Sequence, residues 1–273
     1  MSLDPQGYNY VCDLVRDNSG VILDVGKEYL VEARLRPLAE SAGLGTVHMF
    51  IERLRATPPG EAHRSVVEAM TTNETSFFRD LSPFEALRKT ILPRLIEARG
   101  NERQLNIWSA ACSTGQEPFT LAIILREYFG ELAQWTCRIH ATDLARKVIE
   151  RARAGTYNQA EINRGLPAAL MLKYFRRDRL NWVIRDDIRE MVDFAEINLT
   201  KPWPAMPSMD LILLRNVLIY FNTGAKQFIF KAARKLLKPD GYLLLGNAET
   251  TLGVDDSFER LPGDRNGWHQ IRK

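Results

Sequence analysis

The chain has only three cysteines, and their spacing fits neither a disulfide framework nor a zinc site. Cys12, Cys112 and Cys137 lie far apart, and none belongs to a C-x-x-C pair. Because cysteine-based metal sites usually contain such pairs, no metal is expected. Sparse, unpaired cysteines are typical of proteins in a reducing compartment, so the sequence predicts a cytoplasmic protein.

Long hydrophobic runs are also missing. Although 45% of the 273 residues are hydrophobic, no apolar run approaches the roughly 18 residues of a membrane span. The first six residues are polar and include Asp4 and Pro5, so no secretory signal is expected. We therefore expect a globular protein that does not insert into a membrane, with one large domain or two smaller ones.

The net charge is only +3, but it is unevenly distributed. Residues 1–70 hold seven Lys or Arg and ten Asp or Glu, so they are net acidic, whereas the remainder is net basic. The densest basic run is Arg-Arg-Asp-Arg at 176–179. Such a run is either a docking surface for an acidic partner or an ordinary solvated face, and the sequence favours neither.

The first quarter of the chain shows helical spacing of its apolar residues. Residues 8–70 carry few strand signals, which predicts a compact helical bundle. Residues 43–46 indicate a helix stop followed by a new N-cap at Thr46. Pro37 lies inside the second helical pattern and predicts a kink or a helix boundary there.

From about Leu105 the pattern changes to short apolar runs separated by helices, which indicates a parallel sheet covered on both faces. The expected strands are Leu105–Trp108, Arg138–Thr142, Met191–Ile197, Leu211–Leu214 and Tyr242–Leu245, with Trp268–Ile271 as a final edge strand. Asn222 is expected to cap a helix that runs to Leu237, and residues 238–241 are expected to turn the chain back into the sheet.

The glycine-rich motif G-x-G-x-x-G is absent, but a turn of small residues follows the first expected strand. Ala110 to Gly115 are all small, and they lead into an amphipathic helix expected over 119–129. Small side chains let a ligand approach the backbone, and the helix N-terminus presents N–H groups, as where an open α/β sheet binds a nucleotide-like cofactor. A single glycine gives a pyrophosphate no close cradle, which argues against NAD. Ordinary packing explains one such glycine equally well.

Four residues near the expected strand ends suit such a cofactor. Asp143 ends the second strand, where an acid accepts hydrogen bonds from ribose hydroxyls; its alternative is to cap a helix over 145–154. Glu117 lies in the first turn of the helix and needs no function there, since it suits the helix dipole. Asn198 and Leu199 follow the third strand and suit either an adenine ring or a simple turn.

Two further segments have unusual compositions. Residues 73–79, Asn-Glu-Thr-Ser-Phe-Phe-Arg, join the two regions of the chain. Residues 74–76 are able to cap a helix that begins near Phe77. Two adjacent aromatic residues beside Arg79 instead suit a buried ligand wall. Residues 215–221, Arg-Asn-Val-Leu-Ile-Tyr-Phe, follow the fourth strand.

With the small-residue turn, these two segments resemble the CheR-type family of chemotaxis receptor glutamate methyltransferases, which use S-adenosylmethionine. The resemblance extends from Gly20 to Gly241. It implies an all-helical N-terminal domain over residues 1–72, which recognises the receptor. It also implies a doubly wound, Rossmann-like α/β methyltransferase domain over residues 73–273. A small inserted β-subdomain is expected near residues 157–190, with an antiparallel piece around Trp182.

The resemblance also assigns the site. The implied cofactor-binding residues are Asn73, Thr75, Arg79, Ala110, Gly115, Glu117, Asp143, Leu144, Asn198, Leu199, Arg215 and Asn216. Arg79 and Tyr220 are the implied catalytic residues, which orient the substrate carboxylate.

The implied reaction moves a methyl group from a sulfonium to a glutamate carboxylate, leaving a glutamyl methyl ester and S-adenosylhomocysteine. A glutamate is already ionised at neutral pH, so no general base is needed. The four histidines accordingly fall in no catalytic constellation. Catalysis then depends on in-line positioning and desolvation, and oriented reactants supply roughly 7–11 kcal/mol.

The implied substrate is the cytoplasmic helices of methyl-accepting chemoreceptors. Some family members dock a longer, Gly-containing loop of the β-subdomain on a peptide at the receptor's C-terminus. The matching stretch here, 176–181, has no glycine, which should remove the tight turn and strand edge for an added peptide. We therefore expect a monomer that recognises the helices without a C-terminal pentapeptide tether. The expected contacts are Arg34, Arg36, Arg53 and Arg55.

Two other functions remain open. One is a methyltransferase on a small molecule or RNA, although the acidic N-terminal region and the missing N-P-P-Y signature argue against a nucleic-acid partner. The other is a catalytically silent signalling module that binds the cofactor. Loss of Arg79 or Tyr220 would have indicated the silent module, and both are present.

Overall fold

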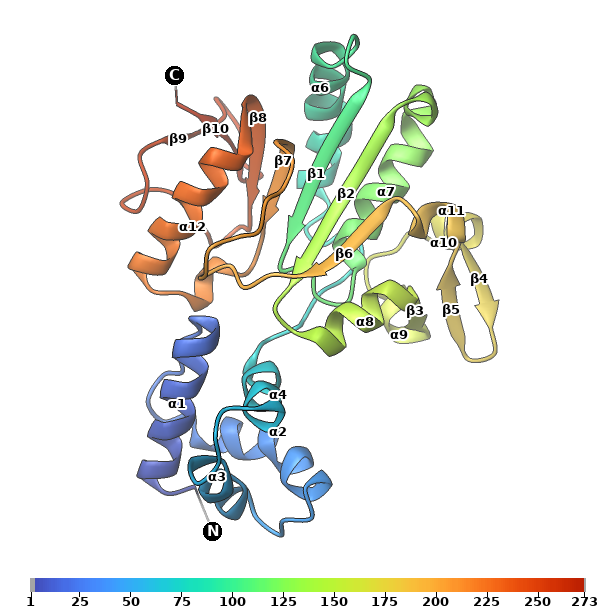
Figure 1. Cartoon of the computed structure of the whole chain (residues 1–273). Coiled ribbons are helices and arrows are strands. Elements are labelled where there is room, and N and C mark those ends of the chain that lie inside the picture. The colour runs from blue at the N-terminus through green and yellow to red at the C-terminus, as the bar shows by residue number, and fades with distance from the viewer. Residues whose placement is uncertain (1–2, 273) are drawn as a thin grey trace. The chain divides into compact units, whose positions relative to one another are not determined.

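The computed structural model describes residues 3–272, which fold as two compact units (Figure 1). One unit comprises the residues up to Thr72 together with Tyr220–Ala225, and the other comprises Asn73–Ile219 and the residues from Lys226 onward. Within the first unit, the N–H of Ile22 donates to the carbonyl of Tyr220 at 3.1 Å. Tyr220 therefore belongs with the helical unit, although it follows a sheet strand in sequence.

The helical unit consists of α1 (Pro5–Ser19), α2 (Glu28–Ser41), α3 (Val47–Arg55) and α4 (Glu61–Met70). The side chain of Thr46 accepts a hydrogen bond from the N–H of Met49, so the predicted N-cap is confirmed. α2 continues through Pro37, and the helix boundary predicted there is wrong. A proline removes one backbone hydrogen bond, while Leu35 and Ala39 on either side keep the helix packed on the core.

Arg34 in α2 has a structural task. Its Nη1 donates to the backbone carbonyls of Met70 at 2.8 Å and Thr71 at 3.0 Å. These carbonyls end α4, where a cation satisfies free acceptors and suits the helix dipole. We therefore remove Arg34 from the expected receptor contacts. The other three arginines named for that contact have exposed side chains: Arg36, Arg53 and Arg55.

The second unit is built on a seven-stranded sheet with the order β6-β2-β1-β7-β8-β10-β9 (Figure 1). The strands are β1 (Gln104–Ala110), β2 (Thr136–Asp143), β6 (Val192–Glu196), β7 (Met209–Leu214), β8 (Leu237–Leu245), β9 (Phe258–Arg260) and β10 (Trp268–Ile271). The first five strands in this order, β6, β2, β1, β7 and β8, pair in parallel with their neighbours. β10 pairs antiparallel with both β8 and β9. The doubly wound α/β fold is confirmed. The edge position predicted for β10 is wrong, because β9 pairs along its outer side.

The helices and helical turns from residue 73 onward connect these strands. They are α5 (Ser82–Ala86), η1 (Leu87–Ile91), α6 (Leu92–Ala98), α7 (Gln116–Tyr128), η2 (Gly130–Gln134), α8 (Arg146–Ala154), α9 (Gln159–Asn163), α10 (Ala168–Tyr174), α11 (Asp186–Arg189), η3 (Leu218–Tyr220) and α12 (Thr223–Leu236). Asn222 accepts a hydrogen bond from the N–H of Ala225, which confirms it as the cap of α12.

The turn predicted at 238–241 lies within β8. β7 and β8 pair Met209 with Leu237 and Leu211 with Tyr242, so residues 238–241 stand opposite a single residue of β7. The chain does loop out here, but strand pairing continues on both sides of the loop. The irregularity was therefore predicted at the correct residues, but it is a bulge within β8 and not a turn before the strand.

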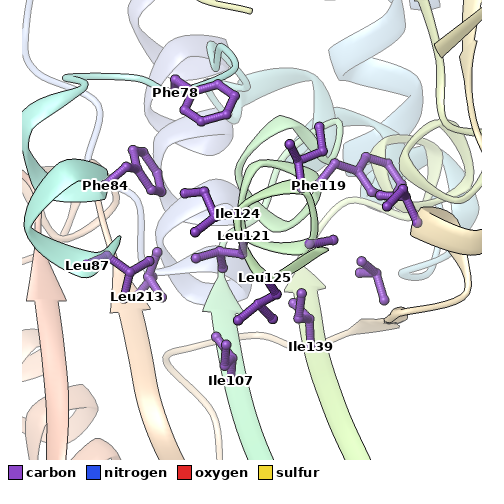
Figure 2. Packing of buried hydrophobic residues seen from close by; sticks show 14 of the residues in the cluster. Phe78, Phe84, Leu87, Ile107, Phe119, Leu121, Ile124, Leu125, Ile139 and Leu213 are labelled. Atoms are coloured by element: carbon purple, nitrogen blue, oxygen red, sulfur yellow. The ribbon is translucent and has the colours of Figure 1, made fainter. Parts of the chain in front are cut away.

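Helix α7 is buried on nearly all sides. It begins at Gln116, three residues earlier than predicted, and every residue from Pro118 to Leu125 is buried. Figure 2 shows Leu121 and Leu125 in the same buried cluster as Ile107 of β1. Because α11 also packs on α7, the helix lacks a long solvated face. The amphipathic helix predicted here is therefore wrong, because exposed side chains gather only in the last turn of α7.

The inserted segment forms a three-stranded antiparallel sheet in the order β3-β5-β4, which confirms the predicted β-piece around Trp182. Its strands are β3 (Thr156–Asn158), β4 (Phe175–Asp178) and β5 (Asn181–Ile184). Only Arg179 and Leu180 join β4 to β5, and Arg179 has a φ of 52°. A tight turn thus forms without glycine, and β4 lies at a sheet edge. The expectation that the lack of glycine at 176–181 removes the tight turn and the strand edge is therefore wrong.

Candidate active site

The carboxyl ends of four parallel strands meet at one edge of the sheet. Ala110 of β1 pairs with Thr142 of β2 and Leu214 of β7, and Asp143 of β2 pairs with Glu196 of β6. The segments that follow these strands therefore begin side by side. They carry the predicted site residues Ala110, Gly115, Glu117, Asp143, Leu144, Asn198, Leu199, Arg215 and Asn216.

Strained backbone gathers in the three predicted motifs. Seven described residues other than glycine have a positive φ. Four of them lie in these motifs, namely Phe78, Ala111, Ser113 and Asn216, and Asp80 directly follows the first motif. Such conformations cost about 1–3 kcal/mol each and persist only where the surroundings hold them. The loops at this edge are therefore held by specific contacts.

Arg215 joins the three motifs. Its side chain is 2% exposed, and Nη1 donates to Oε2 of Glu117 at 3.0 Å. Nη2 donates to Oδ2 of Asp80 at 3.0 Å and to the carbonyl of Arg79 at 2.9 Å. The other oxygen of Glu117 accepts from the hydroxyl of Ser109 at 2.8 Å. One guanidinium thus connects the segment after β7, the start of α7 and the segment around Arg79.

One nitrogen of the Arg215 guanidinium makes no hydrogen bond to the described residues. Its Nε is buried and has no hydrogen-bond partner among residues 3–272. A buried donor without a partner costs roughly 1–3 kcal/mol, which an acceptor on a ligand would remove. Glu117 and Asp80 already balance the charge of the guanidinium. The site therefore suits a ligand that brings a hydrogen-bond acceptor to Nε.

Asp143 holds the small-residue turn in place. Its side chain is buried, with Oδ2 accepting from the N–H of Ser113 at 2.9 Å and Oδ1 from the N–H of Ala145 at 3.1 Å. The hydroxyl of Ser113 donates to the carbonyl of Asn73 at 2.7 Å, which ties in the first motif. Binding of ribose hydroxyls by this carboxylate stays a prediction. The alternative of a helix cap is not what forms, since Ala145 is the N-cap of α8.

Gly115 is required by packing. It has a φ of 94°, and a Cβ there would lie 3.1 Å from both Cβ of Ala152 and the hydroxyl of Tyr157. That hydroxyl donates to the carbonyl of Thr114 at 2.8 Å, so the inserted segment supports the turn. The space beside Gly115 is filled by protein, so packing explains why a glycine stands here, and its contact with a cofactor stays a prediction.

Comparison with known proteins gives the same assignment to both parts of the chain. The model of the CheR methyltransferase SAM binding domain matches residues 73–266, and the model of the CheR methyltransferase all-alpha domain matches residues 6–71. The chain belongs to the CheR methyltransferase family.

Curated relatives of this CheR methyltransferase cover nearly its whole length. Chemotaxis protein methyltransferase 1 of Pseudomonas aeruginosa is 38% identical over 247 residues, which are 89% of each chain. Chemotaxis protein methyltransferase Cher2 of Pseudomonas putida is 36% identical over the same share. The chemotaxis protein methyltransferase of Vibrio parahaemolyticus is 34% identical over 96% of this chain and 95% of its own.

Likeness to solved structures is weaker. The glycopeptide N-methyltransferase MtfA in complex with S-adenosylmethionine has a TM-score of 0.34 and 15% identity, over 67% of this chain and 66% of that chain.

The first motif of this CheR methyltransferase forms a turn. Residues 77–80 precede α5, so the helix predicted to begin near Phe77 is absent there. Phe77 is fully buried, and the centroid of its ring lies 5.0 Å from that of Tyr157 and 5.5 Å from that of Phe175. It is core packing and not the predicted ligand wall. Arg79 is half-buried, and its Nη1 donates to the carbonyl of Glu74 at 3.0 Å.

The adenine-side prediction stays open. Oδ1 of Asn198 accepts from the N–H of Thr200 at 3.0 Å and from its hydroxyl at 2.8 Å, so the turn alternative is present. Leu199 is buried, while Leu144 is half-buried beside Asp143. Contacts of these residues with a cofactor remain predictions, as do those of Thr75. The role of Tyr220 in orienting the substrate carboxylate is also still a prediction.

Two carboxylates of this edge escaped the sequence reasoning. Asp80 directly follows Arg79 and pairs with Arg215, and the charged pair at 79–80 was a signal for it. Glu249 accepts several backbone hydrogen bonds beyond β8. Its only signal in the sequence is its place just after an expected strand.

Other chemistry finds little support among the described residues. Burial raises the pKa of the Cys112 thiol well above its usual value, so this residue stays protonated and is not a nucleophile. Within residues 3–272, no group of three potential ligands could hold a metal ion. No helix in the same range is long and apolar enough to span a membrane.

Proposed function

We propose that this protein transfers the methyl group of S-adenosylmethionine to glutamate side chains of chemoreceptors, giving glutamyl methyl esters. The observation that carries the proposal is the Arg215 network, which joins three motifs of a CheR methyltransferase at the carboxyl edge of the sheet. The named relatives are chemotaxis methyltransferases. A different methyl acceptor or a silent signalling module has no comparable support.

The residues at this edge fit S-adenosylmethionine. Asp143 offers acceptors to the ribose hydroxyls, and Nε of Arg215 offers a buried donor to the carboxylate of the amino-acid end. Asn198 and Leu199 follow β6, where they suit the adenine edge and face. When bound, the cofactor supplies an electrophilic methyl group on a sulfonium.

The protein's own task is to position an already ionised nucleophile. Because a glutamate is charged at neutral pH, no side chain has to remove a proton. Arg79 carries five N–H donors, and one of them donates to the carbonyl of Glu74. We assign to Arg79, together with the hydroxyl of Tyr220, the orientation of the carboxylate. The ion pairs of Arg215 with Glu117 and Asp80 keep that second guanidinium from competing for the substrate.

We propose that the methyl acceptors lie on cytoplasmic helices of the receptor, and that the enzyme acts as a cytoplasmic monomer. Exposed arginines of the helical unit support this, since they complement acidic helix faces: Arg36, Arg53 and Arg55. We also propose that no C-terminal tether is needed, because the loop between β4 and β5 is limited to Arg179 and Leu180. The edge of β4 is the feature that would fit a tether instead.

Labelled cofactor tests the function directly. Receptor-bearing membranes mixed with the protein and methyl-labelled S-adenosylmethionine should gain label on the receptor, and mild base should release it as methanol. Base-stable label would indicate transfer to nitrogen. Binding of S-adenosylhomocysteine without any transfer to receptors would favour the silent module.

A further inference from the structure

Glu249 is a fourfold acceptor at the carboxyl ends of β7 and β8. Oε2 accepts from the N–H of Asn216 at 2.8 Å and of Gly246 at 2.7 Å. Oε1 accepts from the N–H of Val217 at 2.8 Å and of Leu218 at 2.7 Å. One carboxylate thus connects three consecutive residues after β7 with the residue that follows β8.

This convergence imposes a particular backbone on the segment after β7. Three consecutive N–H groups reach one carboxylate because Asn216 adopts a left-handed φ of 58°. Gly246 makes the close approach possible, since a Cβ there would lie 2.7 Å from Oε2 of Glu249 and 2.9 Å from the backbone N of Asn216. The geometry therefore needs both a carboxylate at 249 and no side chain at 246.

The segment that Glu249 holds is part of the active site. It begins at Arg215, whose guanidinium joins the three motifs, and includes Asn216, a predicted cofactor-binding residue. It continues through η3 into Tyr220, the predicted orienting hydroxyl. A small rotation of the backbone at 216–218 would move the Arg215 side chain on one side and the start of η3 on the other.

We propose that Glu249 is a positioning residue for the cofactor, which it does not itself touch: it fixes residues 215–218 in the conformation that binding requires. This inference rests on the proposed function and assigns a role to a residue outside the predicted site. Because the backbone is held before the cofactor arrives, binding need not spend free energy on ordering the segment.

Glu249→Gln removes the acceptor with little change of shape. The amide keeps one oxygen, but its NH₂ group now faces two N–H donors. The Kd for S-adenosylhomocysteine should rise about tenfold, measured by calorimetry, with a parallel rise in the KM for S-adenosylmethionine. The KM for the receptor should not change. Glu259→Gln is the matched control. The carboxylate of Glu259 is exposed and makes only a long contact, 3.9 Å, with Arg272, so this variant should behave as wild type.

Two further variants separate positioning from general loss of stability. Gly246→Ala leaves the carboxylate but crowds Asn216, so it should raise the same Kd and the same KM. Glu249→Asp keeps both oxygens and should restore part of the affinity, and it replaces Glu249→Gln if that variant does not fold. Measurements at a temperature where thermal melts show every variant folded remove any stability effect from the comparison.

The outcomes are distinct. Unchanged affinity for S-adenosylhomocysteine in a folded Glu249→Gln protein would overturn the positioning role, as would equal rises in the KM values of cofactor and receptor. Failure of the proposed function gives a different result: the wild-type protein would bind S-adenosylhomocysteine but leave receptors unlabelled. The affinities of the variants for S-adenosylhomocysteine would still decide the role of Glu249. A wild-type protein that binds no cofactor would refute both.

Discussion

Two buried arginines lie at opposite ends of β7. Near its start, all three guanidinium nitrogens of Arg99 are used: Nε donates to Asp210 at 2.6 Å, and Nη1 and Nη2 donate to Asp240 at 2.8 and 2.5 Å. After its end, Arg215 uses Nη1 and Nη2 and leaves Nε buried without a partner among the described residues. Backbone strain is also present at 216, next to Arg215.

The difference separates stability from binding. At the Arg99 end, hydrogen bonds from the guanidinium lower the pKa of Asp240, and Asp210 also accepts from the N–H of Asn106 at 2.8 Å. Such a network is complete within the protein. The Arg215 network lacks one acceptor, so its free energy is lowest only when a ligand supplies it. The incomplete end of the strand is where the cofactor site is proposed.

The largest effect should come from breaking the complete network. Arg99→Ala leaves the carboxylate of Asp210 fully buried, with Lys238 at 3.0 Å as its remaining cation. Removing one partner of a buried pair costs 3–5 kcal/mol, and we expect about 3 kcal/mol because Lys238 remains. Urea denaturation measures this loss, with the exposed Arg94→Ala as control.

The same variant tests whether the two ends are independent. Folded Arg99→Ala protein should bind S-adenosylhomocysteine with wild-type affinity. A large drop in that affinity would show that the ends of β7 are coupled and would break the comparison.

Arg79→Ala should show the reverse pattern. We expect about a hundredfold loss of methyl transfer, the size seen when one donor to a reacting group is removed, and a melting temperature within a few degrees of wild type. Initial rates with labelled cofactor measure the first, and thermal melts the second. Arg79→Lys keeps the charge and should be less impaired. A variant that melts far lower, yet is fully active once folded, would make Arg79 a structural residue.

Asp143→Ala should weaken cofactor binding through the ribose. Losing hydrogen bonds to a charged group costs about 1.5–3 kcal/mol, or roughly ten- to hundredfold in the Kd for S-adenosylhomocysteine. Calorimetry measures it. Because Asp143 also holds Ser113 and Ala145, Asp143→Asn is the control that keeps one acceptor for the turn. Unchanged affinity in folded Asp143→Ala would refute the ribose assignment.

Stability should fall with pH in two separate steps. Burial lowers the pKa values of His140 and His269 below 6.5. Their contribution is full above pH 6.5 and is lost as the pH falls through the lowered values. The hydrogen bond from Arg99 lowers the pKa of Asp240 below 3.8, so its contribution is lost only at still lower pH. Urea denaturation at several pH values should show both steps. Arg99→Ala should reduce only the second, to which Glu74, Glu85 and Glu127 also contribute because hydrogen bonds from basic side chains lower their pKa values.

The smallest effect is expected from the receptor side. Deleting the receptor's C-terminal tail should leave the methylation rate nearly unchanged, because recognition is assigned to the exposed arginines of the helical unit. Raising the salt concentration should slow methylation by screening that contact. A large loss of rate on tail deletion, or tight binding of the isolated tail peptide, would instead assign recognition to the edge of β4.

Much of the fold follows from local sequence. The spacing of apolar residues predicts both regions, and residues fixed by their immediate neighbours were predicted correctly, such as the caps Thr46 and Asn222. The place of Asp143 at the end of β2 was predictable for the same reason, since the end of a strand shows in the pattern. Errors arose where tertiary packing overrides local preference, as in α2 at Pro37 and in the buried helix α7.

The contacts that hold the site are not local. Arg215 contacts residues 98 and 135 positions away in the chain, and Glu249 contacts residues 31 to 33 positions away. No periodicity connects such positions. The packing around Gly115 could not be predicted either, because only the structure shows that Ala152 and Tyr157 occupy the space beside it. The sequence therefore predicts which residues reach the edge, and packing decides their partners.

The burial of α7 has a consequence for motion. A helix whose residues from Pro118 to Leu125 are all buried cannot expose its amides by fraying or by local opening. The amide hydrogens of residues 119–125 should exchange with solvent only when the whole α/β unit unfolds. Glu117, in the first turn of this helix, therefore presents its carboxylate from a support that stays fixed through each catalytic cycle. Rearrangement during turnover is left to the loops that follow the strands.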